Sequence, residues 1–388
     1  MKKLLLVLFA ISLFLFAQNN PIKFYHENWG EVLKVAKEQN KMIFLDAYAS
    51  WCGPCKYMSN VIFTNDTVGN FYNNNFINAK FDMEKGEGLE LAKKYEVRVY
   101  PTLLYLNPDG EIIHRIAGSM NVSDFVEEGK IALNGKNLKY YQNEFANGRK
   151  DEVFIKEYIS LLQKAYLDAK DVLDVYFSNL KDEDRTKSDN LNLIFENVDD
   201  ITSDLFKLLI SNLDKLNKPE NEIVDGLKYK FRMDLITMMR KNSNANYTYD
   251  MWLERTKDLN FKLKDELLAY NKIMYFQRLK DWKNYLNACE IYLTKYQNSN
   301  AKAINEICWN TYRMLPKDNE ALNFTEKWIK KALELERDEE ILDTYANILF
   351  AKGDKNNAIK IEEEAIELAK KKNKDIENYI KTLEKFKK

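Results

Sequence analysis

Hydrophobic and polar positions between residues 24 and 134 follow two periodicities in alternation. Continuous apolar runs bounded by turn residues predict buried strands, and apolar residues three and four positions apart predict amphipathic helices. Helices and strands that alternate in this way are typical of an α/β domain. The elements expected in chain order are helix 29–39, strand 41–48, helix 52–63, helix 66–72, strand 76–82, helix 89–95, strands 102–106 and 112–117, and helix 123–133.

Residues 138–388 carry an almost uninterrupted pattern of amphipathic helices. Ten of the twelve glycines lie between Gly30 and Gly148, so the loops that need positive φ angles are concentrated in the first part of the chain. We therefore expect an α/β domain over residues 18–135, an irregular helical array over 136–300 and helical repeats over 301–388. The clearest helices expected in the array are 153–165, 169–180, 203–216, 222–240, 261–277 and 282–296.

An internal repeat at an offset of 33 residues supports the last of these regions. Residues 309–312 align with 342–345, and residues 331–335 align with 364–368. This period is close to the roughly 34 residues of tetratricopeptide repeats, which are helix-turn-helix units that bury an apolar face by stacking. Residues 301–388 therefore resemble tetratricopeptide repeats. Such an array offers a concave surface for a peptide or protein, and the alternative is that it serves as a spacer or lid.

The N-terminus has the form of a secretory signal peptide. A basic start, residues 1–3, is followed by an apolar run of fourteen residues from Leu4 to Ala17. Because a membrane-spanning helix needs about 20 residues, export with cleavage after Ala17 is expected, with retention as an uncleaved anchor as the alternative. We therefore expect a signal peptide over residues 1–17 and a periplasmic or secreted protein.

The overall composition is that of a folded protein without a strong charge preference. Lys and Arg number 59 against 60 Asp and Glu, so the net charge of −1 gives no electrostatic reason to expect binding to nucleic acid or to an anionic membrane surface. No sequence feature calls for a cofactor. The richness in Lys, Asn and Ile is in the style of a bacterial sequence, which agrees with the periplasm as the compartment.

The segment Trp51-Cys52-Gly53-Pro54-Cys55-Lys56 carries the candidate chemistry, because it follows a buried strand at the point where a helix is expected to begin. Unpaired N–H groups and the positive end of the helix dipole stabilise a thiolate there, which makes Cys52 the candidate nucleophile. Cys55 lies one helical turn further on the same face and is the candidate resolving thiol. Half of a zinc site is the alternative, but the other two cysteines, Cys289 and Cys308, are neither adjacent to it nor paired in sequence.

This segment resembles the active site of the thioredoxin family, and the resemblance extends over roughly residues 24–134. The family has a buried acidic residue six positions before the first cysteine, where Asp46 stands in this chain, and the implied role is to relay a proton to and from Cys55. Lys80 matches a lysine that the family keeps near that carboxylate. Because an unpaired carboxylate in an apolar strand is costly to ionise, we expect Asp46 to have a raised pKa or to meet a cation.

The resemblance also implies a substrate-binding surface. Tyr100 and Pro101 match the family's cis-proline segment, which pairs its backbone with an incoming peptide, and only X-Pro bonds populate the cis form readily. Tyr100 is a departure, because the family more often has Thr, Ile, Val or Leu there, and a ring at this position would narrow the range of substrates or tune the potential. Residues 63–68 look most like the periplasmic subgroup, which includes the C-terminal domain of the transmembrane disulfide reductase. The residues implied to bind substrate are Trp51, Gly53, Pro54, Tyr100, Pro101 and Gly118.

The resemblance implies an exported thiol-disulfide oxidoreductase that reduces or exchanges disulfides of protein substrates. A membrane disulfide reductase would supply electrons, and the helical region would recruit a peptide or protein partner. The rival interpretation is a non-enzymatic scaffold built on the helical array, against which the intact set of Cys52, Cys55, Asp46 and Pro101 counts. The two later cysteines, residues 289 and 308, either form a structural disulfide or remain buried thiols.

Overall fold

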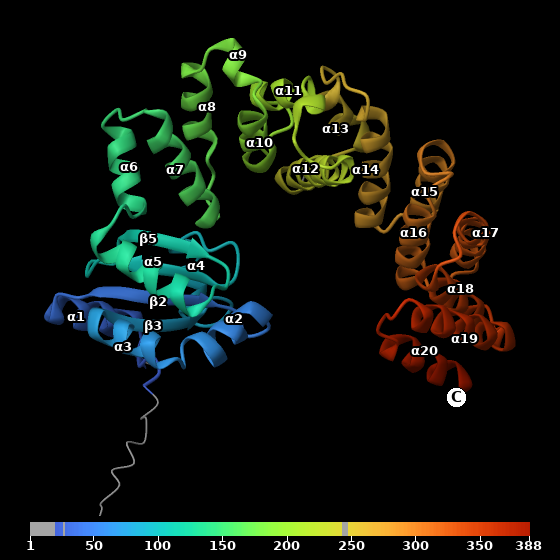
Figure 1. Ribbon diagram of the computed structural model, residues 1–388, viewed down its shortest axis with the longest axis horizontal. Coiled ribbons are helices and arrows are strands. Elements are labelled where there is room, and N and C mark those ends of the chain that lie inside the picture. The colour runs from blue at the N-terminus through green and yellow to red at the C-terminus, as the bar shows by residue number, and fades with distance from the viewer. Residues whose placement is uncertain (1–19, 26–27, 243–246) are drawn as a thin grey trace, which may run out of the picture. The chain divides into compact units, whose positions relative to one another are not determined.

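The computed structural model of the chain describes residues 20–25, 28–242 and 247–388 (Figure 1). These residues form two compact units, with the division between Asp182 and Glu183. The predicted signal peptide, residues 1–17, lies outside the described residues. Within the described part of the chain, no helix combines the length and the apolar character that crossing a membrane requires.

A five-stranded mixed sheet forms the centre of the first unit. Its strand order is β1-β3-β2-β4-β5, with β2 parallel to β3 and antiparallel to β4. The four strands predicted from the apolar pattern are confirmed, whereas β1 was not predicted, because two residues are too few to show a periodicity. The strands are β1 (Phe24–Tyr25), β2 (Met42–Tyr48), β3 (Phe76–Asp82), β4 (Thr102–Leu106) and β5 (Ile112–Ala117).

Two apolar clusters lie on opposite faces of this sheet. One contains Leu45 of β2 together with Trp29 of α1, and the other contains Phe44 of β2 together with Tyr72 of α3. Because side chains alternate along a strand, Asp46 points to the same face as Phe44. The predicted α/β fold is therefore confirmed. Its helices are α1 (Trp29–Gln39), α2 (Gly53–Tyr57), α3 (Asp66–Asn75), α4 (Gly88–Lys94) and α5 (Val122–Asn134).

The helix that follows β2 changes its geometry along its length. α2 continues directly into a π-helical turn, η1 (Met58–Ile62). The N–H of Phe63 donates to the carbonyl of Met58 at 2.8 Å, which is the i to i+5 bond of a π-helix. The single helix predicted over residues 52–63 is therefore correct in extent, but its second half is wider than an α-helix.

Three further helices belong to the first unit. Arg115 of β5 is buried and connects them to the sheet, because its Nε donates to the carbonyl of Ala165 at 3.0 Å. His114, next in sequence, accepts from the N–H of Leu138 through Nδ1 at 3.3 Å. The first compact unit thus extends as far as Asp182, and the domain boundary expected near residue 135 stays a prediction. These helices are α6 (Leu138–Ala146), α7 (Glu152–Lys164) and α8 (Lys170–Asn179).

The described elements after α8 are all helices. The two copies of the sequence repeat fall on corresponding helices, the first pair of segments on α16 and α18 and the second pair on α17 and α19. The assignment to tetratricopeptide repeats stays a prediction. The helices are α9 (Asp182–Arg185), α10 (Ser188–Asn197), α11 (Asp204–Ile210), α12 (Glu220–Lys241), α13 (Tyr249–Thr256), α14 (Lys264–Leu279), α15 (Trp282–Tyr296), α16 (Ala301–Met314), α17 (Asn319–Leu335), α18 (Glu339–Ala351), α19 (Lys355–Lys371) and α20 (Glu377–Lys387).

The prediction of one continuous helix over residues 203–216 is wrong. α11 ends at Ile210, and a short 3-10 turn, η2 (Leu213–Lys215), follows it. The side chains of Ser211 and Asn212 donate to carbonyl groups of the last helical turn at 2.8 and 2.9 Å. These bonds satisfy carbonyls that a helix end leaves without partners, so the helix can stop there at little cost.

The two later cysteines are buried free thiols, which decides between the two alternatives left open by the sequence. Cys289 of α15 and Cys308 of α16 lie in one apolar cluster of the second unit. Burial raises the pKa of Cys289 to about 12 and raises that of Cys308 well above its ordinary value. Both side chains therefore act as small apolar groups in the core.

Candidate active site

The structure places Cys52 and Cys55 at the start of the helix that follows β2. Cys52 is the N-cap of α2, and its Sγ accepts a hydrogen bond from the N–H of Cys55 at 3.1 Å. Pro54 stands in the first turn, where its missing N–H removes no helical hydrogen bond. The two cysteines form a disulfide, with their Cα atoms 5.3 Å apart.

The disulfide is enclosed although the loop around it is exposed. Cys52 is 3% exposed and Cys55 is 2% exposed, whereas Gly53 and Pro54 are exposed. After reduction, the positive end of the helix dipole and the unpaired N–H groups would stabilise a thiolate at Cys52 more than at Cys55, which lies within the first turn. The geometry therefore makes the two sulfur atoms chemically unequal.

The segment that precedes β4 lies beside the disulfide. The Tyr100–Pro101 peptide bond is cis, as the resemblance implied. The side chain of Tyr100 packs against the cluster that contains Cys52 and Cys55. Gly118 donates its N–H to the carbonyl of Pro101 at 2.8 Å and has a φ of 94°, a value that favours glycine. The structure thus brings three of the predicted substrate-binding positions to one place.

Trp51 adds an exposed aromatic ring to the same surface. Its side chain is 67% exposed, and its indole N–H donates to Oε2 of Glu84 at 2.7 Å. The rings of Trp51 and Tyr100 meet edge to face, with centroids 6.0 Å apart. Burial and the charges of Glu84 and Asp82 raise the pKa of Tyr100. The sequence did not identify Glu84, because nothing in the turn after β3 distinguishes it from other exposed acidic residues.

Asp46 and Lys80 form an ion pair across β2 and β3. Asp46 is fully buried, and its Oδ2 lies 3.1 Å from Nζ of Lys80. Burial raises the pKa of Asp46 from its ordinary value of 3.8 to about 6, and the charge of Lys80 limits the rise. Neither oxygen of Asp46 accepts a well-aligned hydrogen bond from a described residue. Both outcomes expected for this carboxyl, a raised pKa and a neighbouring cation, therefore occur together.

These groups suit thiol–disulfide exchange. The pair of sulfur atoms can alternate between a disulfide and a dithiol. A carboxyl with a pKa of about 6 can accept and return a proton near neutral pH. Among the described residues, no group of three or more His, Cys, Asp or Glu side chains is arranged to hold a metal ion.

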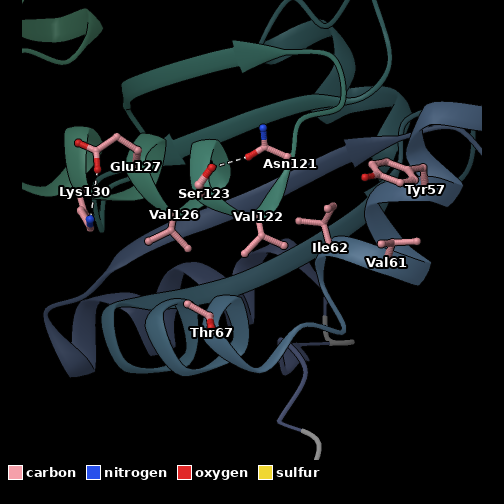
Figure 2. Close-up of a pocket in the computed structure, with 10 residues that line it drawn as sticks. All are labelled: Tyr57, Val61, Ile62, Thr67, Asn121, Val122, Ser123, Val126, Glu127 and Lys130. Atoms are coloured by element: carbon pink, nitrogen blue, oxygen red, sulfur yellow. Dashed lines mark hydrogen bonds and ion pairs between the residues drawn. The ribbon is translucent and has the colours of Figure 1, made fainter.

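A shallow groove with a volume of about 730 Å³ lies along the helix that carries the two cysteines, between η1 and α5 (Figure 2). Tyr57, two residues after Cys55, lines one part of it, and Val122 and Val126 of α5 line another. Lys130, 3.1 Å from Glu127 in an ion pair, also lines the groove. No periodicity or motif in the sequence pointed to this groove, because its walls come from helices that are distant along the chain.

The chain is similar to known proteins over the residues that build this site. A family model described as a thioredoxin-like domain matches residues 29–130. Thioredoxin-1 of Drosophila melanogaster is 36% identical over 73 residues, which are 19% of this chain and 64% of that protein. Thioredoxin H5 of Arabidopsis thaliana is 32% identical over 93 residues, which are 24% of this chain and 73% of that protein.

Bacterial proteins are also similar to this region. The thiol:disulfide interchange protein DsbD of Yersinia pestis is 31% identical over 120 residues, which are 28% of this chain and 20% of that protein. Among solved structures, that of a candidate disulphide isomerase from Bacteroides thetaiotaomicron is 42% identical and covers 30% of this chain and 98% of that chain, with a TM-score of 0.29. This chain thus spans less than two thirds of the Drosophila thioredoxin and a fifth of DsbD. The helices from α6 onward lie outside the matched family model.

Proposed function

Because the chain belongs to the thioredoxin-like family, we propose that it is a thiol-disulfide oxidoreductase that acts on the disulfides of protein substrates. The observation that carries this proposal is the bonded Cys52–Cys55 pair at the start of α2. The ion pair of Asp46 and Lys80 supports it, because it supplies a buried proton acceptor with a pKa near neutral pH. Exchange between a dithiol and a disulfide needs no bound cofactor, since the electrons move with the sulfur–sulfur bonds.

The reduced protein would react in two steps. The thiolate of Cys52 attacks one sulfur of the substrate disulfide, forms a mixed disulfide and expels the other substrate sulfur, which takes up a proton. Asp46, whose pKa is tuned by Lys80, then accepts the proton of Cys55. The new thiolate of Cys55 attacks Sγ of Cys52. This step expels the second substrate sulfur and forms the Cys52–Cys55 disulfide. The second substrate sulfur takes up the proton that Asp46 holds. The substrate thus gains two electrons from the protein and two protons, one from Cys55 by way of Asp46 and one from the solvent that took the proton of Cys52.

The surface around the disulfide would position the substrate. The backbone of Tyr100 and Pro101 would pair with an extended peptide, as an added strand does at a sheet edge. The surface over Gly118 is open, since a Cβ added at this position would meet no atom within 4 Å. Trp51 would shield the reacting sulfur atoms from water, and the exposed Gly53-Pro54 turn would border the bound peptide.

We place this activity outside the cytoplasm and assign it the reducing direction. The basic and apolar pattern of residues 1–17 supports export to the periplasm. The Cys-Gly-Pro-Cys segment resembles the reducing members of the family, and a membrane disulfide reductase would restore the dithiol. The helical region, whose repeat at an offset of 33 resembles tetratricopeptide repeats, would recruit protein partners.

Reduction of insulin disulfides, driven by dithiothreitol, tests the proposed activity. Cys52→Ser is expected to lower the catalysed rate by at least about 100-fold, because the attacking thiolate is gone. A variant with both Cys289→Ala and Cys308→Ala is the matched control and should keep the rate within about two-fold, because these thiols are inert. A wild-type protein that does not accelerate the reaction would instead support the rival role of a binding scaffold.

The reduction potential of the Cys52–Cys55 pair tests the direction. Equilibration with thiol buffers, followed by alkylation of Cys52, gives this value. A potential of about −270 mV would make the protein an electron donor, whereas a potential of about −120 mV would make it a disulfide donor. The second result would contradict the reducing role and leave the exchange activity intact.

A further inference from the structure

The ammonium of Lys80 lies between two strands and the active-site helix. Its Nζ lies 3.1 Å from Oδ2 of Asp46 and donates to Oγ of Ser59. The ring of Tyr48 is 4.6 Å from Nζ and that of Phe63 is 5.5 Å from it. An ammonium has three N–H donors and no acceptor, so a carboxylate and a hydroxyl are suitable partners for it. Within the described part of the chain, these two groups are its polar side-chain partners.

Ser59 belongs to the helix that carries the disulfide. It follows Cys55 by four residues, so the two side chains lie on the same face of the helix. Ser59 also stands inside the π-helical turn, which is closed by the bond from Phe63 to Met58. One helix face thus presents a thiol to the exchange reaction and a hydroxyl to the cation beside Asp46.

We propose that Ser59 is a positioning residue that holds the Lys80 ammonium against the Asp46 carboxylate. This inference rests on the proposed exchange function of the Cys52–Cys55 pair. Lys80 has a flexible four-carbon stem and a side chain that is 22% exposed, so water offers its ammonium an alternative environment. The hydroxyl of Ser59, on the active-site helix, accepts a hydrogen bond from the ammonium and so keeps it from turning toward water. The pKa of Asp46 depends on where this ammonium lies, because the buried carboxylate has no other compensating charge among the described residues.

The position of Lys80 decides at which pH Asp46 can accept the proton of Cys55. Burial raises the pKa of Asp46 to about 6, and the attraction of Lys80 limits that rise. Without the hydroxyl of Ser59, the ammonium would turn toward water and the pKa of Asp46 would rise further. Among the described residues, Lys80 is the charged group that acts on Asp46, and Tyr48 on β2 is a further titratable group beside the pair, with its ring 4.6 Å from the Lys80 ammonium. Burial and nearby carboxylates raise the pKa of Tyr48, so its phenol stays neutral and adds no charge.

The direct test is the NMR titration of the Asp46 carboxyl carbon in the full-length oxidised protein. In Ser59→Ala, the midpoint is expected to rise by about 0.5–1 pH unit, and the pH profile of disulfide exchange should move by the same amount. Ser59→Thr keeps the hydroxyl and should titrate like the wild type. Ser50→Ala is the matched control, because it removes a bond of the same kind, from Lys85 at 3.2 Å, and should leave the midpoint unchanged.

The same substitution in a Lys80→Gln protein distinguishes a positioning role of Ser59 from a structural one. If Ser59 acts through Lys80, then Ser59→Ala should cause no further shift of the Asp46 midpoint in a Lys80→Gln protein. An unchanged midpoint in Ser59→Ala alone would overturn the proposal, and so would an equal shift in the Lys80→Gln protein. The NMR titration does not require activity. A shifted midpoint in a protein without exchange activity would therefore support this inference and contradict the proposed function.

Discussion

Each of the two compact units contains a pair of buried cysteines, but the pairs differ in their position on a helix. Cys52 and Cys55 occupy the N-cap and first turn of α2 and are bonded to one another. Cys289 and Cys308 lie within α15 and α16, have 0% exposure and remain free thiols. A helix start offers unpaired N–H groups to a thiolate, whereas a helix interior in an apolar cluster offers none. Placement, and not residue type, therefore decides which pair can exchange disulfides.

The buried carboxyls of the two units differ in the same way. Asp46 has the cation of Lys80 beside it, so its pKa rises only to about 6. Glu362 of α19 is fully buried and faces Asp343 of α18 instead. Burial and the charge of Asp343 raise the pKa of Glu362, and no described residue forms an ion pair with it. The cation of Lys80 keeps Asp46 able to exchange protons near neutral pH, whereas the neighbouring carboxyl of Asp343 makes Glu362 retain its proton.

The largest expected difference between the units is in alkylation. In the reduced native protein, iodoacetamide should modify Cys52 at least about 1,000 times faster than Cys289 or Cys308, because thiolate content and access both favour Cys52. Peptide mass spectrometry after timed quenching measures the three rates. In denaturant all cysteines should react at similar rates, which serves as the control. Comparable labelling of Cys289 in the native protein would contradict the comparison.

A truncation experiment tests how far the first unit extends along the chain. A chain that ends after Asn137 loses the partners that Ala165 and Leu138 provide to Arg115 and His114, whereas a chain that ends after Asp182 keeps them. We expect the shorter chain to lose roughly 3–5 kcal/mol in free energy of unfolding relative to the longer one, because buried polar groups lose their partners and apolar surface is exposed. Urea denaturation measures both values. Equal stabilities would show that α6–α8 are not part of the first unit's core.

Asp46→Asn tests the cost of the buried carboxylate. The pKa of Asp46 is higher in the folded protein than its ordinary value of 3.8, so its contribution to stability is fully present below about pH 4 and is lost as the pH rises through about 6. Removing the charge should therefore raise the free energy of unfolding by about 1–3 kcal/mol at about pH 7.5, and by close to zero at about pH 3.5. Urea denaturation at the two pH values provides the measurement. A gain of equal size at both values would assign the effect to packing.

Glu362→Gln applies the same test to the second unit, with a smaller expected effect. The folded pKa of Glu362 is raised, so the wild-type protein should lose stability as the pH rises above the ordinary range of a carboxyl. Gln does not ionise and can donate a hydrogen bond to Asp343. Between about pH 5 and about pH 9, the free energy of unfolding of the variant should therefore fall by at least about 1 kcal/mol less than that of the wild type. Thermal denaturation across this range measures the difference. An identical pH dependence in both proteins would show that Glu362 has a partner that keeps it ionised.

Local sequence patterns predicted most of the first unit because each signal lies within a few residues. The run from Met42 to Tyr48 marked β2, and the Cys52–Cys55 spacing marked a thiol pair at a helix start. The proline at position 101 marked the cis bond. Contacts between distant residues left no such mark. Ser59 is 21 positions from Lys80, and Trp51 is 33 positions from Glu84, so only folding brings each pair together.

The sequence by itself determined which elements form, where the reactive cysteines stand and which carboxyl lies inside a strand, because periodicity and helix-start chemistry act over short distances. Tertiary structure decided how far the first unit extends, since the bond from Arg115 to Ala165 spans 50 residues. It also decided the fate of the remaining ionisable groups. Cys289 became an inert thiol, and Asp46 acquired a pKa of about 6, through burial and neighbours that no local pattern encodes.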